Sequence, residues 1–219
     1  MIEFSVAEEL RPRVRLGLVV LDGVAVRERD PALDAEVDRH CASLRERYGS
    51  GKSSEVPGTA DARTLYKALG IDPTKTRPSN EALLRRALKG ETLYRINTLV
   101  DALNLVSLRE QLPFGLYDLA RVSPPVTLRR GLAGEQYEGI RKGPVSVEGR
   151  PVLVDALGPF GNPTSDSLRT SIGLEARRAL VVAYAPAGHP APRLQAVLER
   201  TAETLTRFCG GTVAESRLL

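Results

Sequence analysis

The sequence has few of the residues that form disulfides and zinc sites. Its 219 residues include two cysteines, Cys41 and Cys209, and two histidines, His40 and His189. Each cysteine lies in a helical pattern where a small thiol packs well, so both are predicted to be structural and not to form a disulfide. No Cys-x-x-Cys or His-x-x-x-His spacing occurs, which excludes a zinc site of recognisable type. We therefore expect neither a metal nor a cofactor.

Long apolar runs are also missing. No segment approaches the roughly 20 apolar residues that a membrane-spanning helix needs. The first residues, MIEFSVAEEL, include acids where a signal peptide has a basic region followed by an apolar stretch. We therefore predict a cytoplasmic protein with no membrane contact. The proportions of hydrophobic residues (42%) and charged residues (26%) are typical of folded proteins, and the length favours a single domain over 1–219.

Residues 51–53, Gly-Lys-Ser, match the end of the nucleotide-binding P-loop pattern, but the rest of that pattern is absent. Position 46 is glutamate rather than glycine, and the segment follows a predicted helix rather than a strand. Such a loop is not held at the edge of a sheet in front of a helix N-terminus. We therefore interpret 49–60 as an ordinary loop.

The secondary-structure signals change near Val126. Before it, Asp22-Gly23 predicts a hairpin over 14–26, and helices are predicted over about 31–49, 61–70, 79–89 and 96–112. After it, short β-rich runs separated by glycine and proline indicate a sheet or a pair of packed sheets. A helix from about 190 and an edge strand over 212–219 end the chain. The order of elements predicts an α+β fold in which the hairpin and the later strands share a core with the helices.

One predicted helix combines apolar packing with a polar stripe. In RINTLVDALNLVSL (95–108), apolar residues surround most of the helix axis, but Asn97, Asp101 and Asn104 recur at a spacing that places them on one face. A mostly buried helix has no inexpensive way to bury two amides and a carboxylate as well. The stripe therefore predicts either a polar pocket or structural caps for neighbouring segments.

This stretch continues as RINTLVDALNLVSLREQLPFGLYDL and resembles the tRNA-editing (B3/B4) domain of the phenylalanyl-tRNA synthetase beta subunit. The family pattern P-I-N-x-x-V-D-x-x-N-x-x-x-L, then Pro, then an aromatic-Asp pair, is matched by Ile96, Asn97, Val100, Asp101, Asn104, Leu108, Pro113, Tyr117 and Asp118. Two further elements follow in order, LRRGLAGE and VLVDALGP, with matches at Arg129, Gly134, Glu135, Asp155 and Gly158. The resemblance is strongest over about 75–185.

The resemblance implies an α+β fold with a β-sandwich and a pocket that receives an aminoacyl group. It implies that Asn104 is a pocket residue, and it leaves Asn97 and Asp101 open between the pocket and the fold. Where the family has a pocket histidine, this chain has Gly115, and the family's glutamate aligns near Ser171, so specificity for tyrosine is not implied. The loop GPFGNPTSDSLRTS offers other polar contacts, from Asn162, Thr164, Ser165, Asp166, Ser167 and Thr170.

The family reaction is hydrolysis of the ester between an amino acid and the tRNA 3′ end, which needs an oriented water, here positioned by Asp101 or Asp166. The first interpretation is a freestanding trans-editing hydrolase that deacylates mischarged aminoacyl-tRNA. The alternatives are a non-catalytic module that binds an amino acid, a small metabolite or RNA, and a hydrolase of another amino-acid ester or amide. The expected partner is tRNA, although clustered basic residues are often only a solvated surface. The residues predicted to contact RNA are Arg85, Arg86, Arg129, Arg130 and Arg141.

Overall fold

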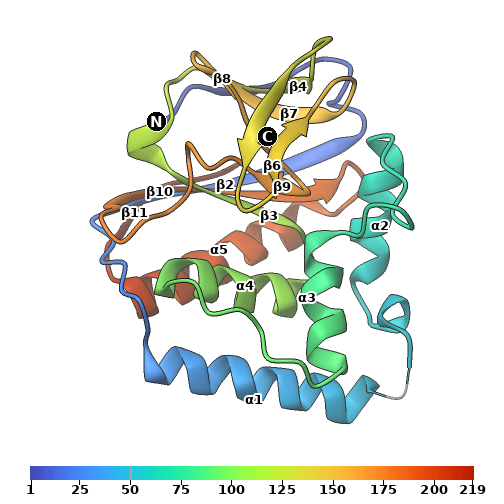
Figure 1. The fold of residues 1–219 in the computed structure, drawn as a ribbon, viewed down its shortest axis with the longest axis vertical. Coiled ribbons are helices and arrows are strands. Elements are labelled where there is room, and N and C mark those ends of the chain that lie inside the picture. Colours follow the sequence, from blue (N-terminus) through green and yellow to red (C-terminus); the bar gives the residue numbers. More distant parts are fainter. Residues whose placement is uncertain (50) are drawn as a thin grey trace.

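The computed structural model describes residues 1–49 and 51–219, and Ser50, within the loop predicted at 49–60, lies outside the described residues. The chain forms three layers, namely a group of helices, a four-stranded sheet and a five-stranded sheet (Figure 1). One face of the four-stranded sheet packs on the helices and the other face packs on the five-stranded sheet. The α+β fold predicted from the sequence is confirmed.

The strands belong to three sheets. The four-stranded sheet is antiparallel, with the strand order β11 (Thr212–Leu218), β2 (Val14–Asp22), β10 (Arg178–Pro186) and β3 (Phe114–Asp118). The five-stranded sheet has the order β1 (Phe4–Val6), β4 (Val126–Arg130), β7 (Pro151–Asp155), β8 (Gly158–Asn162) and β9 (Ser165–Asp166). A separate hairpin consists of β5 (Gln136–Gly139) and β6 (Gly143–Ser146).

The α-helices of the described residues are α1 (Pro31–Tyr48), α2 (Thr59–Ala68), α3 (Ser79–Leu88), α4 (Thr98–Glu110) and α5 (Ala191–Cys209). Short 3-10 turns occupy Ser53–Glu55 and Leu119–Arg121. The predicted helices and the closing edge strand are therefore confirmed, with shifts of a few residues at their ends. Among the described residues, no helix has the length and apolar character needed to cross a membrane.

Strands β2 and β10 lie at the centre of the molecule and are buried on both faces. Alternate side chains of β2 enter different cores, so that Val19 and Leu21 face the helices while Leu18 and Val20 face the five-stranded sheet. This alternation is the normal consequence of the two-residue period of a strand. It explains why the sequence of β2 is apolar almost throughout rather than at every second position.

The hairpin predicted over 14–26 is wrong. Strand β2 is continuous to Asp22, and Gly23, with φ of +72°, only ends it. Residues 24–26 cannot fold back onto β2, because both edges of β2 are already paired with β10 and β11. The amides of Val24 and Ala25 instead donate to the carbonyls of Arg177 and Cys209. The partners of β2 therefore come from the far end of the chain.

Asp155 connects three segments on one side of the five-stranded sheet. Its side chain is fully buried and accepts two hydrogen bonds of 2.9 and 3.0 Å from Arg169. It also accepts the backbone amides of Ser123 and Leu157, each at 2.9 Å. The carboxylate therefore holds the loop before β4, the turn between β7 and β8, and the segment after β9 in fixed relative positions.

We expect Asp155→Ala to lower the free energy of unfolding by about 2–4 kcal/mol, because it leaves two amides and a partly buried guanidinium without their acceptor. The matched control is Asp22→Ala, which breaks the ion pair between Asp22 and Arg178. The Asp22 side chain is 40% exposed and the Arg178 side chain is 54% exposed. That substitution should change stability by only about 0–1 kcal/mol. Urea unfolding of both variants makes the comparison, and equal losses would contradict the assigned role of Asp155.

Candidate functional site

A cavity of about 220 Å³ opens on the helix side of the molecule, between α4, β3 and the β5–β6 turn. Most of its wall is apolar, from Ile96, Val100, Leu103, Phe114, Leu116, Ile140 and Ile172. Three polar residues complete the lining, namely Asn104, Asp166 and Ser171. A small number of polar groups in an otherwise apolar concavity is the usual composition of a ligand site.

Two members of the polar stripe stabilise the start of α4. Asn97 is the N-cap, and its Oδ1 accepts the amide of Val100 at 3.0 Å while its Nδ2 donates to the carbonyl of Ile172 at 3.2 Å. The carboxylate of Asp101 accepts the amide of Ile96 at 3.0 Å. Asn97 thus binds an amide that the helix start leaves unpaired, Asp101 binds the amide of the residue just before the N-cap, and both side chains are buried. Asp101 lies outside the cavity lining.

Asn104 has a different environment. It lies one helical turn beyond Asp101, it is only partly buried, and it faces the cavity. In the part of the chain that the structure describes, its amide has no hydrogen-bond partner. An amide offers two donors and an acceptor, so this side chain is available to a ligand. The stripe on α4 therefore divides into two capping residues and one cavity residue.

Asp166 contributes the carboxyl group of the cavity from β9. The hydroxyl of Tyr117 donates to its Oδ1 over 2.7 Å. Burial raises the pKa of Asp166 to about 7, against the opposing effects of the Tyr117 hydroxyl, the Leu116 amide and the charge of Lys142. A carboxyl group with a pKa near neutrality in a cleft is suited to exchanging protons with a bound molecule.

The other predicted contact residues fall in different places. Ser171 lines the cavity, although its hydroxyl already donates to the carbonyl of Leu168 at 2.9 Å. Ser167 and Thr170 are buried and hydrogen-bond to each other at 2.9 Å. Gly115 is buried in β3 beside the Tyr117 ring. A separate cavity of about 160 Å³ is lined by Asn162, Thr164 and Ser165 together with Lys142 and Arg150.

The five arginines predicted to bind RNA differ in how they are paired. Arg129 forms a bidentate pair with Glu135 at 2.7 and 2.8 Å, and Arg130 donates to the carbonyl of Gly149. Arg86 pairs with Glu91 and lies over the ring of Tyr94. Within the described residues, Arg85 and Arg141 have no such partner. Of these two, Arg141 directly follows the cavity residue Ile140.

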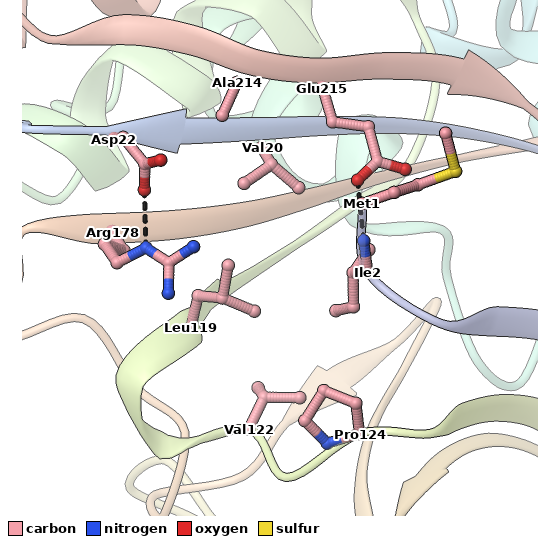
Figure 2. Close-up of a pocket in the computed structure, with 10 residues that line it drawn as sticks. All are labelled: Met1, Ile2, Val20, Asp22, Leu119, Val122, Pro124, Arg178, Ala214 and Glu215. Atoms are coloured by element: carbon pink, nitrogen blue, oxygen red, sulfur yellow. Dashed lines mark hydrogen bonds and ion pairs between the residues drawn. The ribbon is translucent and has the colours of Figure 1, made fainter.

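A larger cavity of about 340 Å³ is lined by residues of β2, β10 and β11, by the first two residues of the chain and by Leu119, Val122 and Pro124 (Figure 2). Its charged side chains are already paired within the protein. Asp22 and Arg178 bind each other, and Glu215 accepts the amide of Ile2 and the guanidinium of Arg217. Because these groups have partners, this cavity is a weaker candidate for ligand binding than the cavity that contains Asn104.

Sequence reasoning missed Tyr117 and Ile140 as residues of the site. Tyr117 occupies the aromatic-Asp position of the family pattern, but its contact with Asp166 depends on two strands that are far apart in the sequence. Ile140 had no local signal, because it reaches the cavity only through the β5–β6 turn, where its amide donates to the carbonyl of Asp166 at 3.2 Å. Among the described residues, no group of acidic, cysteine and histidine side chains has the arrangement of a metal site.

Comparison with known proteins identifies the family. Residues 61–210 match the B3/4 domain, so the chain belongs to the B3/4 domain family. The fold is also that of an N-terminal fragment of the phenylalanyl-tRNA synthetase beta subunit from Pyrococcus horikoshii, with a TM-score of 0.51 and 13% sequence identity. The match covers 97% of this chain and 50% of that fragment, so the chain spans about half of its length. No curated protein matches the chain.

We predict that Asn97→Ala and Asn104→Ala affect stability differently. Loss of the N-cap should lower the free energy of unfolding by about 1–2 kcal/mol. Asn104→Ala should change it by less than about 0.5 kcal/mol, because that side chain makes no hydrogen bond to the described part of the protein. Urea unfolding of the two variants measures the difference. A large loss in the Asn104 variant would show that its amide is structural.

The raised pKa of Asp166 predicts a pH dependence of stability. Between about pH 4 and 7 the unfolded chain has lost this proton and the folded chain keeps it, so rising pH destabilises the folded state. Asp166→Asn removes this effect. The free energy of unfolding of the Asp166→Asn variant, relative to that of the wild type, should therefore increase from pH 4 to 7 and stay constant above pH 7. Urea unfolding across this range tests the prediction, and a difference that does not change with pH would contradict it.

Proposed function

We propose that this chain hydrolyses the ester bond of mischarged aminoacyl-tRNA in trans, and that the cavity of Asn104 and Asp166 is its active site. The observation that carries the proposal is one largely apolar cavity that holds a carboxyl group of near-neutral pKa and an amide without a hydrogen-bond partner among the described residues. Membership of the B3/4 family and the fold of a phenylalanyl-tRNA synthetase fragment support a link to tRNA.

In the proposed reaction Asp166 is the general base. Its carboxylate takes a proton from a water molecule as the water oxygen attacks the ester carbonyl carbon. The Asn104 amide donates to the carbonyl oxygen as negative charge develops there. The carbon–oxygen bond to the terminal ribose then breaks, and the ribose oxygen receives the proton. The products are a free amino acid and an uncharged tRNA. Asp101 is a poorer candidate for the base, because it lies outside the cavity and binds a backbone amide.

The cavity lining also supports a preference among aminoacyl groups. A side chain that enters a wall of leucine, isoleucine and phenylalanine loses its contact with water, which favours apolar amino acids and disfavours charged ones. Arg141, next to Ile140 at the cavity, is available to contact the phosphates of the tRNA 3′ end. The paired arginines Arg86, Arg129 and Arg130 are less available for this role.

The test is to add the purified protein to tRNAs already charged with different amino acids, in the absence of any synthetase. Release of apolar amino acids should be faster than release of charged ones. Asn104→Ala should lower the rate by about 10²–10³-fold, as expected for loss of one donor to a developing oxyanion. Asp166→Asn should lower it by at least about 10²-fold. The matched control is Asp38→Asn, whose side chain is 70% exposed on α1.

The outcomes separate the proposed function from its rivals. Binding of aminoacyl-tRNA without hydrolysis would indicate a non-catalytic module. Equal hydrolysis of free amino-acid esters would indicate a hydrolase with another substrate. Full activity in both cavity variants, with both proteins folded, would place the chemistry elsewhere in the chain.

A further inference from the structure

A pair of buried phenols stands behind the Asp166 carboxyl group, on the side away from the cavity. Tyr117, from β3, and Tyr184, from β10, are both fully buried. The Tyr117 hydroxyl is 2.7 Å from Asp166 Oδ1 and 3.5 Å from the Tyr184 hydroxyl. The Tyr117 ring also packs edge-on against Phe160, with centroids 4.9 Å apart. We propose that Tyr117 is a positioning residue, whose hydroxyl holds the Asp166 carboxyl at the cavity wall and sets the pH range in which it is ionised.

Two glycines provide the space in which the Tyr117 hydroxyl reaches Asp166. Gly115 lies two residues before Tyr117 in β3, so a side chain there would point in the same direction as the phenol. A Cβ atom at Gly115 would lie 2.3 Å from the Tyr117 hydroxyl oxygen, and a Cβ atom at Gly161 in β8 would lie 2.4 Å from it. The phenol therefore passes between two backbones that leave room only for hydrogen. This confinement fixes the hydroxyl in the position from which it can donate to Asp166.

Several charged and titratable groups surround Asp166, and among the described residues its side-chain hydrogen bond comes from Tyr117. Lys142, before β6, is the cation whose charge acts on it. The phenols nearby are Tyr66 of α2, Tyr137 of β5, Tyr117 and Tyr184. Burial raises the pKa of all four phenols, and that of Tyr66 to about 12, so each stays neutral while Asp166 titrates.

A neutral phenol that donates to a carboxylate stabilises its ionised form. Tyr117 therefore opposes the effect of burial and keeps a usable fraction of Asp166 ionised near neutral pH. Because Oδ1 is occupied by Tyr117, the carboxyl is also held against rotation. Removal of the hydroxyl alone should raise the pKa of Asp166 further and leave the ring packing intact.

The first experiment measures the deacylation rate of the Tyr117→Phe variant as a function of pH. It rests on the proposed deacylase function. The acidic limb of the pH–rate profile, where the rate rises as Asp166 ionises, should shift to higher pH by on the order of one pH unit. Activity should therefore fall about five-fold at pH 7 and recover near pH 9. The matched control is Tyr66→Phe, which removes a buried hydroxyl that donates to the carbonyl of Pro163. The control should keep the wild-type limb. An unmoved limb in folded Tyr117→Phe would overturn the inference.

A second measurement does not depend on hydrolysis. Carbon-13 NMR titration of the aspartate carboxyls, with Asp166→Asn to assign the signal, should show the Asp166 titration at higher pH in Tyr117→Phe than in the wild type or Tyr66→Phe. If this shift occurs in a protein without deacylase activity, the role of Tyr117 stands and the proposed function fails. If the Asp166 signal titrates at the same pH in all three proteins, the role of Tyr117 is refuted whatever the activity.

Discussion

The antiparallel ladder between β2 and β10 is the constraint on which the rest of the structure depends. It pairs nine residues of each strand, from Asp22 with Arg178 to Val14 with Pro186. Because β3 extends this ladder, the alternation of its side chains is fixed, and Leu116 faces the helices while Tyr117 faces the second sheet. Asp166, on β9, lies beside β3 at the edge of the four-stranded sheet. The register of β3 therefore places Leu116 in the cavity wall and the Tyr117 hydroxyl against the Asp166 carboxyl group.

Two buried aspartates and one partly buried aspartate show how the same side chain takes different properties from its surroundings. Asp155 faces a guanidinium and two backbone amides, which satisfy it completely as an anion. Asp101 accepts a backbone amide at the start of a helix, and burial raises its pKa. Asp166 has a neutral phenol as its nearest side-chain partner, and its pKa reaches about 7. The contrast follows from what each carboxyl group meets rather than from burial alone.

Local signals were sufficient to predict the helices, the closing edge strand and the α+β class, because caps, periodicity and turn residues act over a few positions. They failed at 14–26, where Asp22-Gly23 predicted a hairpin. Strand β2 instead pairs on both edges with strands from the end of the chain, β10 and β11. Spacing placed Asn97, Asp101 and Asn104 on one face, but it could not show that the first two are used by backbone amides. Ile140 and Ser171 reach the cavity wall through tertiary contacts, which produce no periodic pattern in the sequence.

The β5–β6 turn has a consequence for how such a cavity can change over evolutionary time. Leu103 and Leu116 line the cavity but also belong to the buried core beneath the helices, so substitutions there disturb the whole fold. Ile140 lines the same cavity from the turn, is 39% exposed, and belongs to no core cluster among the described residues. A substitution at this position would change the size of the cavity at little cost in stability, because the side chain is largely outside the core. Selection for a different ligand therefore meets the least resistance in the turn, and descendants of one ancestor can diverge there while their cores stay alike.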